Sequence, residues 1–191
     1  MTAKSDTRTQ ILDIAERLLQ QRGFNAFSYQ DIANQLGMRK ASLHYHFPSK
    51  ADLGFSLAER HANRALTTLQ DIDQLNLTVW QQLDAFFKPF IDIAKSCELM
   101  CVGGMMASES STLPSPMQDR MNEFFAIIHT WLTRVLTQGR ASGQLYFGAE
   151  PSVKADAIIA MLEGSILIAR TRKNADFIDP LIQDIKASLG G

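Results

Sequence analysis

The sequence contains few of the residues that mark several protein classes. It has only two cysteines in 191 residues, Cys97 and Cys101, which are too few for a disulfide scaffold. Its longest apolar run, residues 157–169, is interrupted by Glu163 and Gly164, and its first ten residues include no apolar stretch of signal-peptide type. We therefore expect a cytoplasmic protein without a membrane span, in which both cysteines are thiols.

Charge is also sparse and nearly balanced. The net charge is −1 with 20% charged residues, which argues against indiscriminate binding of nucleic acid. Its distribution is uneven, because residues 1–60 hold eight Lys and Arg against six Asp and Glu, whereas the remainder holds eleven against fourteen. This asymmetry favours a DNA-facing N-terminal segment.

Patterns of catalytic and metal-binding residues are missing as well. The sequence has no nucleophile elbow, phosphate-binding loop or metalloprotease motif. His44 and His46 are two residues apart and so point to different sides of a helix, while His61 and His129 are distant in sequence. We expect no enzyme activity, no cofactor and no metal site.

What the sequence does contain is helical periodicity, with no convincing strand pattern, repeat or low-complexity linker. Apolar residues recur at helical spacing, and capping-box pairs such as Ser49 with Asp52 mark several starts. Thr7 with Gln10 has the same spacing. The patterns predict an all-α protein with helices near residues 7–22, 28–36, 39–47, 49–71, 77–96, 115–142, 152–170 and 176–189.

Residues 28–50 predict two short helices separated by a tight turn. Ser28 can cap the first helix, with Asp31 completing a capping box, and Gly37 stands where a left-handed C-cap residue is needed. The second helix begins near Arg39 or Lys40 and must end before Pro48, because a residue preceding proline is disfavoured in the helical region. Two helices arranged in this way are typical of a DNA-reading module.

The second of these helices has one apolar and one polar face. Leu43 and Phe47 lie one turn apart on the apolar face. The other face carries basic, hydroxyl and aromatic groups that can bind base edges or phosphates: Arg39, Lys40, Ser42, His44 and Tyr45. A solvated surface helix has a similar composition, so the physics of this segment alone leaves both interpretations open.

Residue order makes the interpretation more specific. Residues 8–57 contain Gly23-Phe24, then S-Y-Q-D-I-A-N-Q-L-G-M, then K-A-S-L-H-Y-H-F-P-S-K-A-D-L. They closely resemble the N-terminal domain of the TetR family of bacterial transcriptional repressors, with departures at Met38, Ala41 and His44. The resemblance implies a three-helix helix-turn-helix DNA-binding domain at residues 1–48 joined to a helical ligand-binding and dimerisation domain at residues 49–191.

The resemblance also implies a set of DNA contacts. The start of the first short helix would approach a phosphate and a base. The second helix would enter the major groove with Arg39, Lys40 and Ser42 and touch the DNA backbone with His44 and Tyr45, and the start of the next helix would pair with a phosphate. In this order the implied contacts are Tyr29, Gln30, Arg39, Lys40, Ser42, His44, Tyr45 and Lys50.

Methionine and aromatic residues are concentrated in the middle of the chain. They can form a packed core, or a ligand pocket lined by flexible Met and flat aromatic side chains. In proteins resembling this one, the inducer binds among these helices. The candidate ligand-binding residues are Phe87, Phe90, Ile91, Cys101, Met105, Met106, Phe124, Ile128, Trp131 and Met161.

The two cysteines admit two interpretations. Cys97 and Cys101 are one helical turn apart, which would place both sulfurs on one face if the segment is helical. Isolated cysteines are usually small buried apolar residues. However, the string Cys101-x-x-Gly104-x-x-Ala107-x-Glu109 is similar to that of a subgroup that includes electrophile-sensing repressors, which makes Cys97 and Cys101 possible thiol sensors.

The C-terminal helices predict an interface. The helix at residues 152–170 is apolar nearly all round and contains small residues, so it needs burial on two sides. The resemblance to the TetR family implies that this helix and the last one pair with their copies in a homodimer. The predicted interface residues are Ile158, Leu162, Ile166, Leu181 and Ile185; the alternative is a monomer with a buried penultimate helix.

Together these patterns predict a ligand-responsive DNA-binding transcriptional regulator. As a repressor it would be released from a palindromic operator in double-stranded DNA by a small apolar or electrophilic inducer. The alternative is an all-helical thiol-dependent enzyme, or a partner-binding bundle, without DNA binding.

Overall fold

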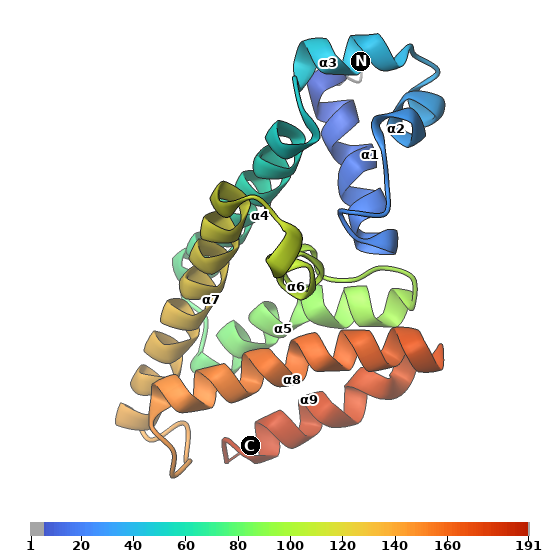
Figure 1. Cartoon of the computed structure of the whole chain (residues 1–191). Helices are drawn as coiled ribbons and strands as arrows, with labels where there is room; N and C mark the ends of the chain where they lie inside the picture. Colours follow the sequence, from blue (N-terminus) through green and yellow to red (C-terminus); the bar gives the residue numbers. More distant parts are fainter. Residues whose placement is uncertain (1–5, 191) are drawn as a thin grey trace, which may run out of the picture. The chain divides into compact units, whose positions relative to one another are not determined.

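The computed structural model describes residues 6–190, which form helices joined by turns (Figure 1). This range contains no strand, so the all-α prediction is confirmed. None of its helices is both long enough and apolar enough to cross a membrane. With the short 3-10 helices written η, the elements are α1 Thr7–Arg22, α2 Tyr29–Leu36, α3 Lys40–His46, α4 Lys50–Gln74, α5 Val79–Ser96, α6 Val102–Ser108, η1 Ser110–Thr112, α7 Ser115–Ala141, α8 Pro151–Arg172, η2 Ala175–Phe177 and α9 Ile178–Ala187.

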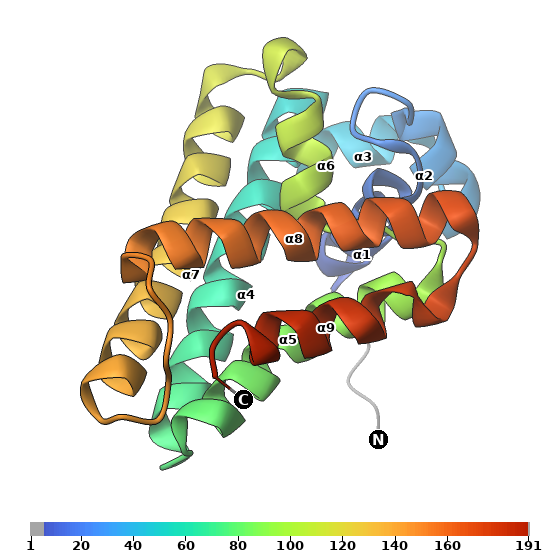
Figure 2. The ribbon, with the colours of Figure 1, turned by 90° about the horizontal axis from the view of Figure 1, so that it is seen from below.

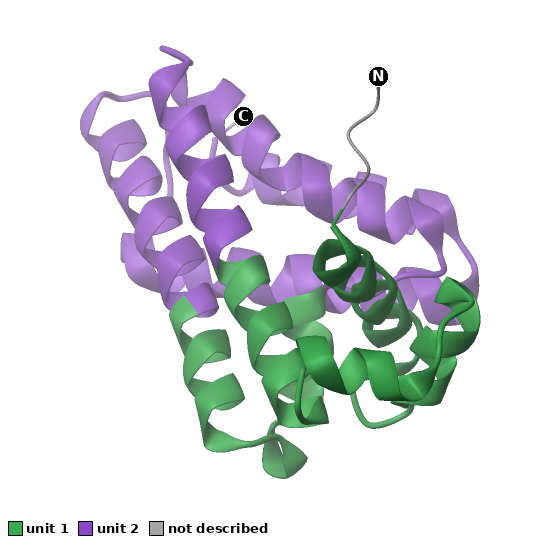
Figure 3. Cartoon of the chain, turned by 90° about the horizontal axis from the view of Figure 1, so that it is seen from above, with its two compact units in different colours: residues 1–62, 102–123 green, residues 63–101, 124–191 purple. Residues whose placement is uncertain are grey.

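The chain divides into two compact units (Figure 3). The first unit comprises the residues up to Ala62 together with Val102–Glu123, and the second comprises Asn63–Cys101 together with the residues from Phe124 on. The first unit therefore contains α1, α2, α3 and α6, and the second contains α5, α8 and α9. Helices α4 and α7 each contribute residues to both units.

In the first unit, the helix-turn-helix forms as its local signals predict. Ser28 and Asp31 make a reciprocal capping box at the start of α2, with 2.8 Å between the Ser28 N–H and Asp31 Oδ2. Gly37 ends α2 in the left-handed region at φ 63°, where a residue without Cβ is favoured. Helix α1 occupies the predicted range, but its N-cap is Asp6 rather than Thr7.

Helix α3 is anchored by its apolar face. Arg39 is its N-cap, and Leu43 and the following Phe47 are 0% and 1% exposed. Ser49 then caps α4, because its N–H and hydroxyl donate to Asp52 at 2.9 and 2.7 Å. The short α3 is thus held between a buried apolar face and a capped helix start, which leaves its other side to solvent.

In the second unit, α8 packs along α5 and beside α9, as both views show (Figures 1 and 2). Helix α5 continues through Pro89, which lies inside the helix. The end of α4 is tied to α7, because Asp73 accepts from Trp131 Nε1 at 2.9 Å and from Arg134 at 2.7 Å. These contacts join the end of α4 to α7 within the second unit.

The segment that joins the two cysteines is not helical, so the condition for placing both sulfurs on one helical face is not met. Cys97 ends α5 in the left-handed region at φ 52°, and α6 begins only at Val102. Residues 97–101 are therefore not helical, and helical spacing cannot place the two sulfurs on one face. Cys97 is partly exposed and Cys101 is buried, and both are thiols.

Candidate nucleic-acid interface and ligand region

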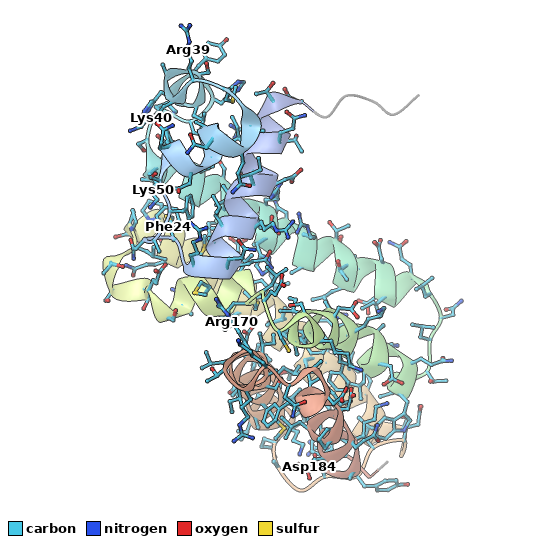
Figure 4. All side chains as sticks on the ribbon, turned by 90° about the vertical axis from the view of Figure 1, so that its right-hand side faces the viewer. Phe24, Arg39, Lys40, Lys50, Arg170 and Asp184 are labelled. Atoms are coloured by element: carbon cyan, nitrogen blue, oxygen red, sulfur yellow. The ribbon has the colours of Figure 1, made fainter. Side chains whose placement is uncertain are left out.

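Helix α3 presents polar side chains to solvent at one end of the first unit. Arg39, Lys40, His44 and Tyr45 are exposed, with Tyr45 at 87%, and Ser42 is partly exposed. Figure 4 shows Arg39 and Lys40 projecting from the ribbon at this end. Two cations, a hydroxyl, an imidazole and a phenol on one short helix can bind both phosphates and base edges.

The helix is held from behind by an arginine of α1. The Arg8 guanidinium lies 4.3 Å from the centroid of the Phe47 ring and donates to the His46 carbonyl at 3.3 Å. It also donates to Ser56 Oγ at 3.3 Å. Arg8 thereby links the end of α3 to both α1 and α4, a role that the sequence analysis missed because the three residues are far apart in the chain.

Tyr29 does not occupy the position predicted for a phosphate contact. Its side chain is 5% exposed, and its hydroxyl lies 2.8 Å from the Phe47 carbonyl and 2.6 Å from the Ser49 carbonyl. Burial, with a smaller contribution from Asp52, raises the pKa of Tyr29 to about 12. The structure therefore gives this phenol a role inside the unit, where it fixes the turn between α3 and α4.

Lys50 is likewise engaged inside the first unit. Its Nζ lies 4.7 Å from the ring centroids of both Phe24 and Phe27, and 3.5 Å from the Asn25 carbonyl (Figure 4). Burial lowers the pKa of Lys50, while the nearby Glu109 raises it. An ammonium held over two aromatic rings stabilises the fold, and the phosphate contact of Lys50 stays a prediction.

Gln30 and His44, two other predicted DNA contacts, interact with neighbouring residues and remain exposed at the surface. Gln30 is exposed, and its Nε2 donates to Asn34 Oδ1 at 2.7 Å. The His44 ring is exposed, with Nδ1 3.0 Å from the Pro48 carbonyl and its centroid 4.8 Å from that of Tyr29. Both side chains are oriented by neighbours of the same unit and are accessible to a ligand.

A carboxylate from the end of α6 fastens the turn between α1 and α2. Glu109 Oε2 accepts from the Phe24 N–H at 2.7 Å, and both of its oxygens lie 3.4 Å from the Asn25 N–H. Asn25 Nδ2 in turn donates to Thr112 Oγ1 at 2.8 Å. In the sequence, Glu109 is only the last residue of a short motif, since no local signal indicates its distant partner.

The predicted ligand-binding residues are mostly buried. Eight of them belong to the second unit, while Met105 and Met106 belong to the first. Ile91, Met105 and Met161 are partly exposed, and those at most 7% exposed are Phe87, Phe90, Cys101, Met106, Phe124, Ile128 and Trp131. The second unit thus has a dense apolar region with few polar groups, the composition that favours binding of a largely apolar ligand.

Aromatic contacts connect part of this region. Phe86, which the sequence analysis did not select, stacks on Trp131 at 5.4 Å and lies 5.9 and 5.5 Å from Phe87 and Phe90. A shallow groove of about 430 Å³ lies elsewhere in the second unit, between α5 and α9. None of the predicted ligand-binding residues lines this groove, whose walls are Trp80, Gln183, Lys186 and Ala187.

The predicted dimer residues lie mainly within the subunit. Ile158, Leu162, Ile166 and Ile185 are at most 2% exposed, and Leu181 is partly exposed. The opposite face of α8 carries exposed apolar and small residues, with Leu167 at 55% and Val153 at 58%. Because α8 is apolar nearly all round, it has two apolar faces. The face that carries the predicted interface residues packs into the core of the subunit itself.

Comparisons with known proteins agree with these observations. Residues 11–56 match the model of "Bacterial regulatory proteins, tetR family", and residues 80–185 match "Tetracyclin repressor-like, C-terminal domain". The HTH-type transcriptional regulator LmrA of Bacillus subtilis is 26% identical over 89% of each chain. The HTH-type transcriptional repressor DhaR of a Mycobacterium species is 22% identical over 94% of this chain and 90% of that one.

Solved structures show the same arrangement of helices. A TetR transcriptional regulator from Legionella pneumophila is 34% identical, with a TM-score of 0.89, and the match covers 99% of this chain and 100% of that chain. Similarity over whole chains means that both the helix-turn-helix and the C-terminal helices are shared.

Proposed function

The chain belongs to the tetR family of bacterial regulatory proteins, and we propose that it is a repressor that a small apolar or electrophilic molecule releases from its operator. Regulators of this family bind DNA and small molecules and act as dimers. The helix-turn-helix and the C-terminal domain match over most of the chain, which makes the protein a ligand-responsive DNA-binding regulator. The alternative of a thiol-dependent enzyme or a partner-binding bundle without DNA binding is not favoured.

The observation that carries the proposal is the surface of α3. Arg39 and Lys40 are exposed at the start of a helix whose far side is buried through Leu43 and Phe47. Lys40 and Ser42 would read base edges, with Arg39, His44 and Tyr45 on bases or phosphates and Gln30 on a neighbouring base. A rigidly held reading helix loses little conformational entropy when it enters the groove.

Dimerisation would double this surface. The exposed face of α8 carries the large side chains of Val153, Leu167 and Ile168 beside small residues that allow close approach of a second helix. An isologous two-fold contact there would place two copies of α3 in successive major grooves about 34–36 Å apart. The operator would accordingly be palindromic.

The ligand would act on the separation of the two reading helices. We place it in the apolar region of the second unit, among the predicted residues around Phe90, Cys101 and Ile128. It must bind the DNA-free arrangement more tightly than the DNA-bound one, because a ligand with equal affinity for both shifts no equilibrium. Helix α4, which contributes residues to both units, is one covalent route for such a change.

Selection of binding sites from a random library of duplexes tests the proposal. We expect a palindromic consensus, and an affinity for it that falls steeply with salt and exceeds that for a scrambled duplex by at least about 1,000-fold. Equal affinity for consensus and scrambled duplexes at every salt concentration contradicts sequence-specific regulation.

A further inference from the structure

Glu163 of α8 has a buried carboxyl group whose oxygens accept no hydrogen bond. The residue is partly exposed through other atoms, but Oε1 and Oε2 are both buried and neither has a hydrogen-bond partner. Buried polar atoms in folded proteins are nearly always paired, so an unpaired carboxyl calls for a specific explanation. An unpaired acid is costly to retain, whereas an apolar residue of similar size would carry no such cost.

The surroundings of this carboxyl are apolar. Ile159 and Ile166, one helical turn before and after it on α8, are 8% and 0% exposed. The thiol of Cys101 is a polar neighbour of this carboxyl, but a thiol is only a weak donor. Burial raises the pKa of Glu163, and the thiol lowers it by a smaller amount.

Two cations of the same helix, Lys154 and Arg172, are engaged with other residues. Lys154 donates to Ser188 Oγ at 2.7 Å, and the Arg172 guanidinium lies 5.1 Å from the Phe177 ring. Within residues 6–190, no lysine or arginine donates a hydrogen bond to either carboxyl oxygen of Glu163. The carboxyl thus borders the apolar region that contains Cys101 and has no hydrogen-bonded counter-charge among the described residues.

We propose that Glu163 is the polar anchor for the inducer, and that the inducer is a lipophilic amine, an apolar molecule bearing a cationic N–H group. The inference rests on the proposed function in one respect, that the apolar region of the second unit is the ligand site. Glu163 was not among the residues selected from sequence, where it served only as a polar interruption of an apolar run.

An amine fits better than a neutral donor because its ammonium group has more hydrogens to donate and carries a positive charge. A hydroxyl supplies one hydrogen and leaves the second carboxyl oxygen unpaired, whereas an ammonium supplies up to three. Its charge also balances the carboxylate in surroundings where screening by water is weak. The apolar body of the ligand would contact the aromatic and aliphatic side chains nearby.

Calorimetric titration of the DNA-free protein tests the inference. The probes are phenylbutylamine, the neutral phenylbutanol, and the phenylbutyl trimethylammonium ion, which keeps the charge but has no N–H. We expect the amine to bind at least about tenfold more tightly than the alcohol, a difference of about 1.4 kcal/mol. The trimethylammonium ion should bind less tightly than the amine.

Two variants assign the preference to one residue. Glu163→Gln keeps the shape and removes the charge, so the advantage of the amine over the alcohol should fall to less than about threefold. Glu98→Gln removes an exposed carboxylate close to Cys101 in sequence and should leave the preference unchanged. If Glu163→Gln does not fold, the three probes on the unaltered protein still decide.

Four outcomes contradict the inference: no binding of the amine at about millimolar concentration, equal binding of amine and alcohol, equal binding of amine and trimethylammonium ion, or a preference that survives Glu163→Gln. Because the titration contains no DNA, these outcomes are separate from a failure of the proposed function. A protein that prefers the amine but binds no duplex specifically would contradict only the latter.

Discussion

The Glu109 carboxylate accepts the backbone N–H of Phe24 at 2.7 Å, although the two residues are 85 positions apart in the chain. Phe24 begins the turn between α1 and α2, and Glu109 follows α6 directly. The same unit places Lys50 over the Phe24 ring. The position of the helix-turn-helix is therefore fixed in part by a residue outside the predicted DNA-binding domain.

Removing the Glu109 carboxylate should destabilise the turn between α1 and α2. We expect Glu109→Ala to lower the free energy of unfolding by about 1.5 kcal/mol, because two backbone N–H groups lose a charged acceptor. The affinity for the selected duplex should fall as well, since the turn precedes α2. Urea denaturation and duplex titration measure the two effects, with the exposed Glu98→Ala as control. Unchanged stability and affinity would show that the contact contributes nothing.

Gly23 should be intolerant of a side chain for two reasons. Its φ is 90°, and a Cβ added there would lie 2.6 Å from Glu109 Oε1. We expect Gly23→Ala to destabilise the protein by more than about 1 kcal/mol. In a double-mutant cycle with Glu109→Ala the cost should be smaller, because only the backbone strain remains. Strictly additive effects would contradict the close approach.

Tyr29→Phe should affect stability rather than DNA binding. The phenol is buried against the Phe47 and Ser49 carbonyls, so removing its hydroxyl should cost about 1 kcal/mol of unfolding free energy. The affinity of the folded protein for the selected duplex should change by less than about twofold. A large loss of affinity at unchanged stability would restore the phosphate contact that the sequence predicts.

Lys40 and Lys50 should behave differently when replaced. Lys40 is exposed on the reading helix, so Lys40→Ala should cost about 1–3 kcal/mol of binding at one or two base positions. Lys50 lies over two aromatic rings, so Lys50→Met should mainly lower stability, by about 1 kcal/mol, and keep the salt dependence of binding. Titrations of both variants across a salt series distinguish these outcomes. A flatter salt dependence for Lys50→Met would indicate a phosphate contact after all.

The exposed face of α8 should mediate dimerisation. Leu167→Asp places a charge on that face and should yield particles near 21.3 kDa by light scattering, with a large loss of operator affinity. Leu75→Asp is the matched control, because Leu75 is 63% exposed at the turn after α4 and outside this face. A dimer that persists in Leu167→Asp locates the interface elsewhere.

The helix-turn-helix was predictable because its signals are local. The Ser28–Asp31 capping box, the left-handed Gly37 and the end before Pro48 each act within a few residues, and the structure forms α2 and α3 between them. Functional assignments within the same module were less predictable. Tyr29 and Lys50 look like surface groups in sequence, and only packing against α3, α4 and the α1–α2 turn turns them inward.

The sequence by itself determined the α-helices of residues 6–190 except α6, and the reading surface of α3, because caps, breaks and apolar periodicity act over short distances. Its residue order determined the family. The tertiary structure alone decided which apolar face of α8 is core, why Glu109 meets Phe24 and where Glu163 lies. These relationships join residues that the chain separates widely. Burial and hydrogen-bond satisfaction depend on all the neighbours of a side chain at once, and a linear pattern does not specify those neighbours.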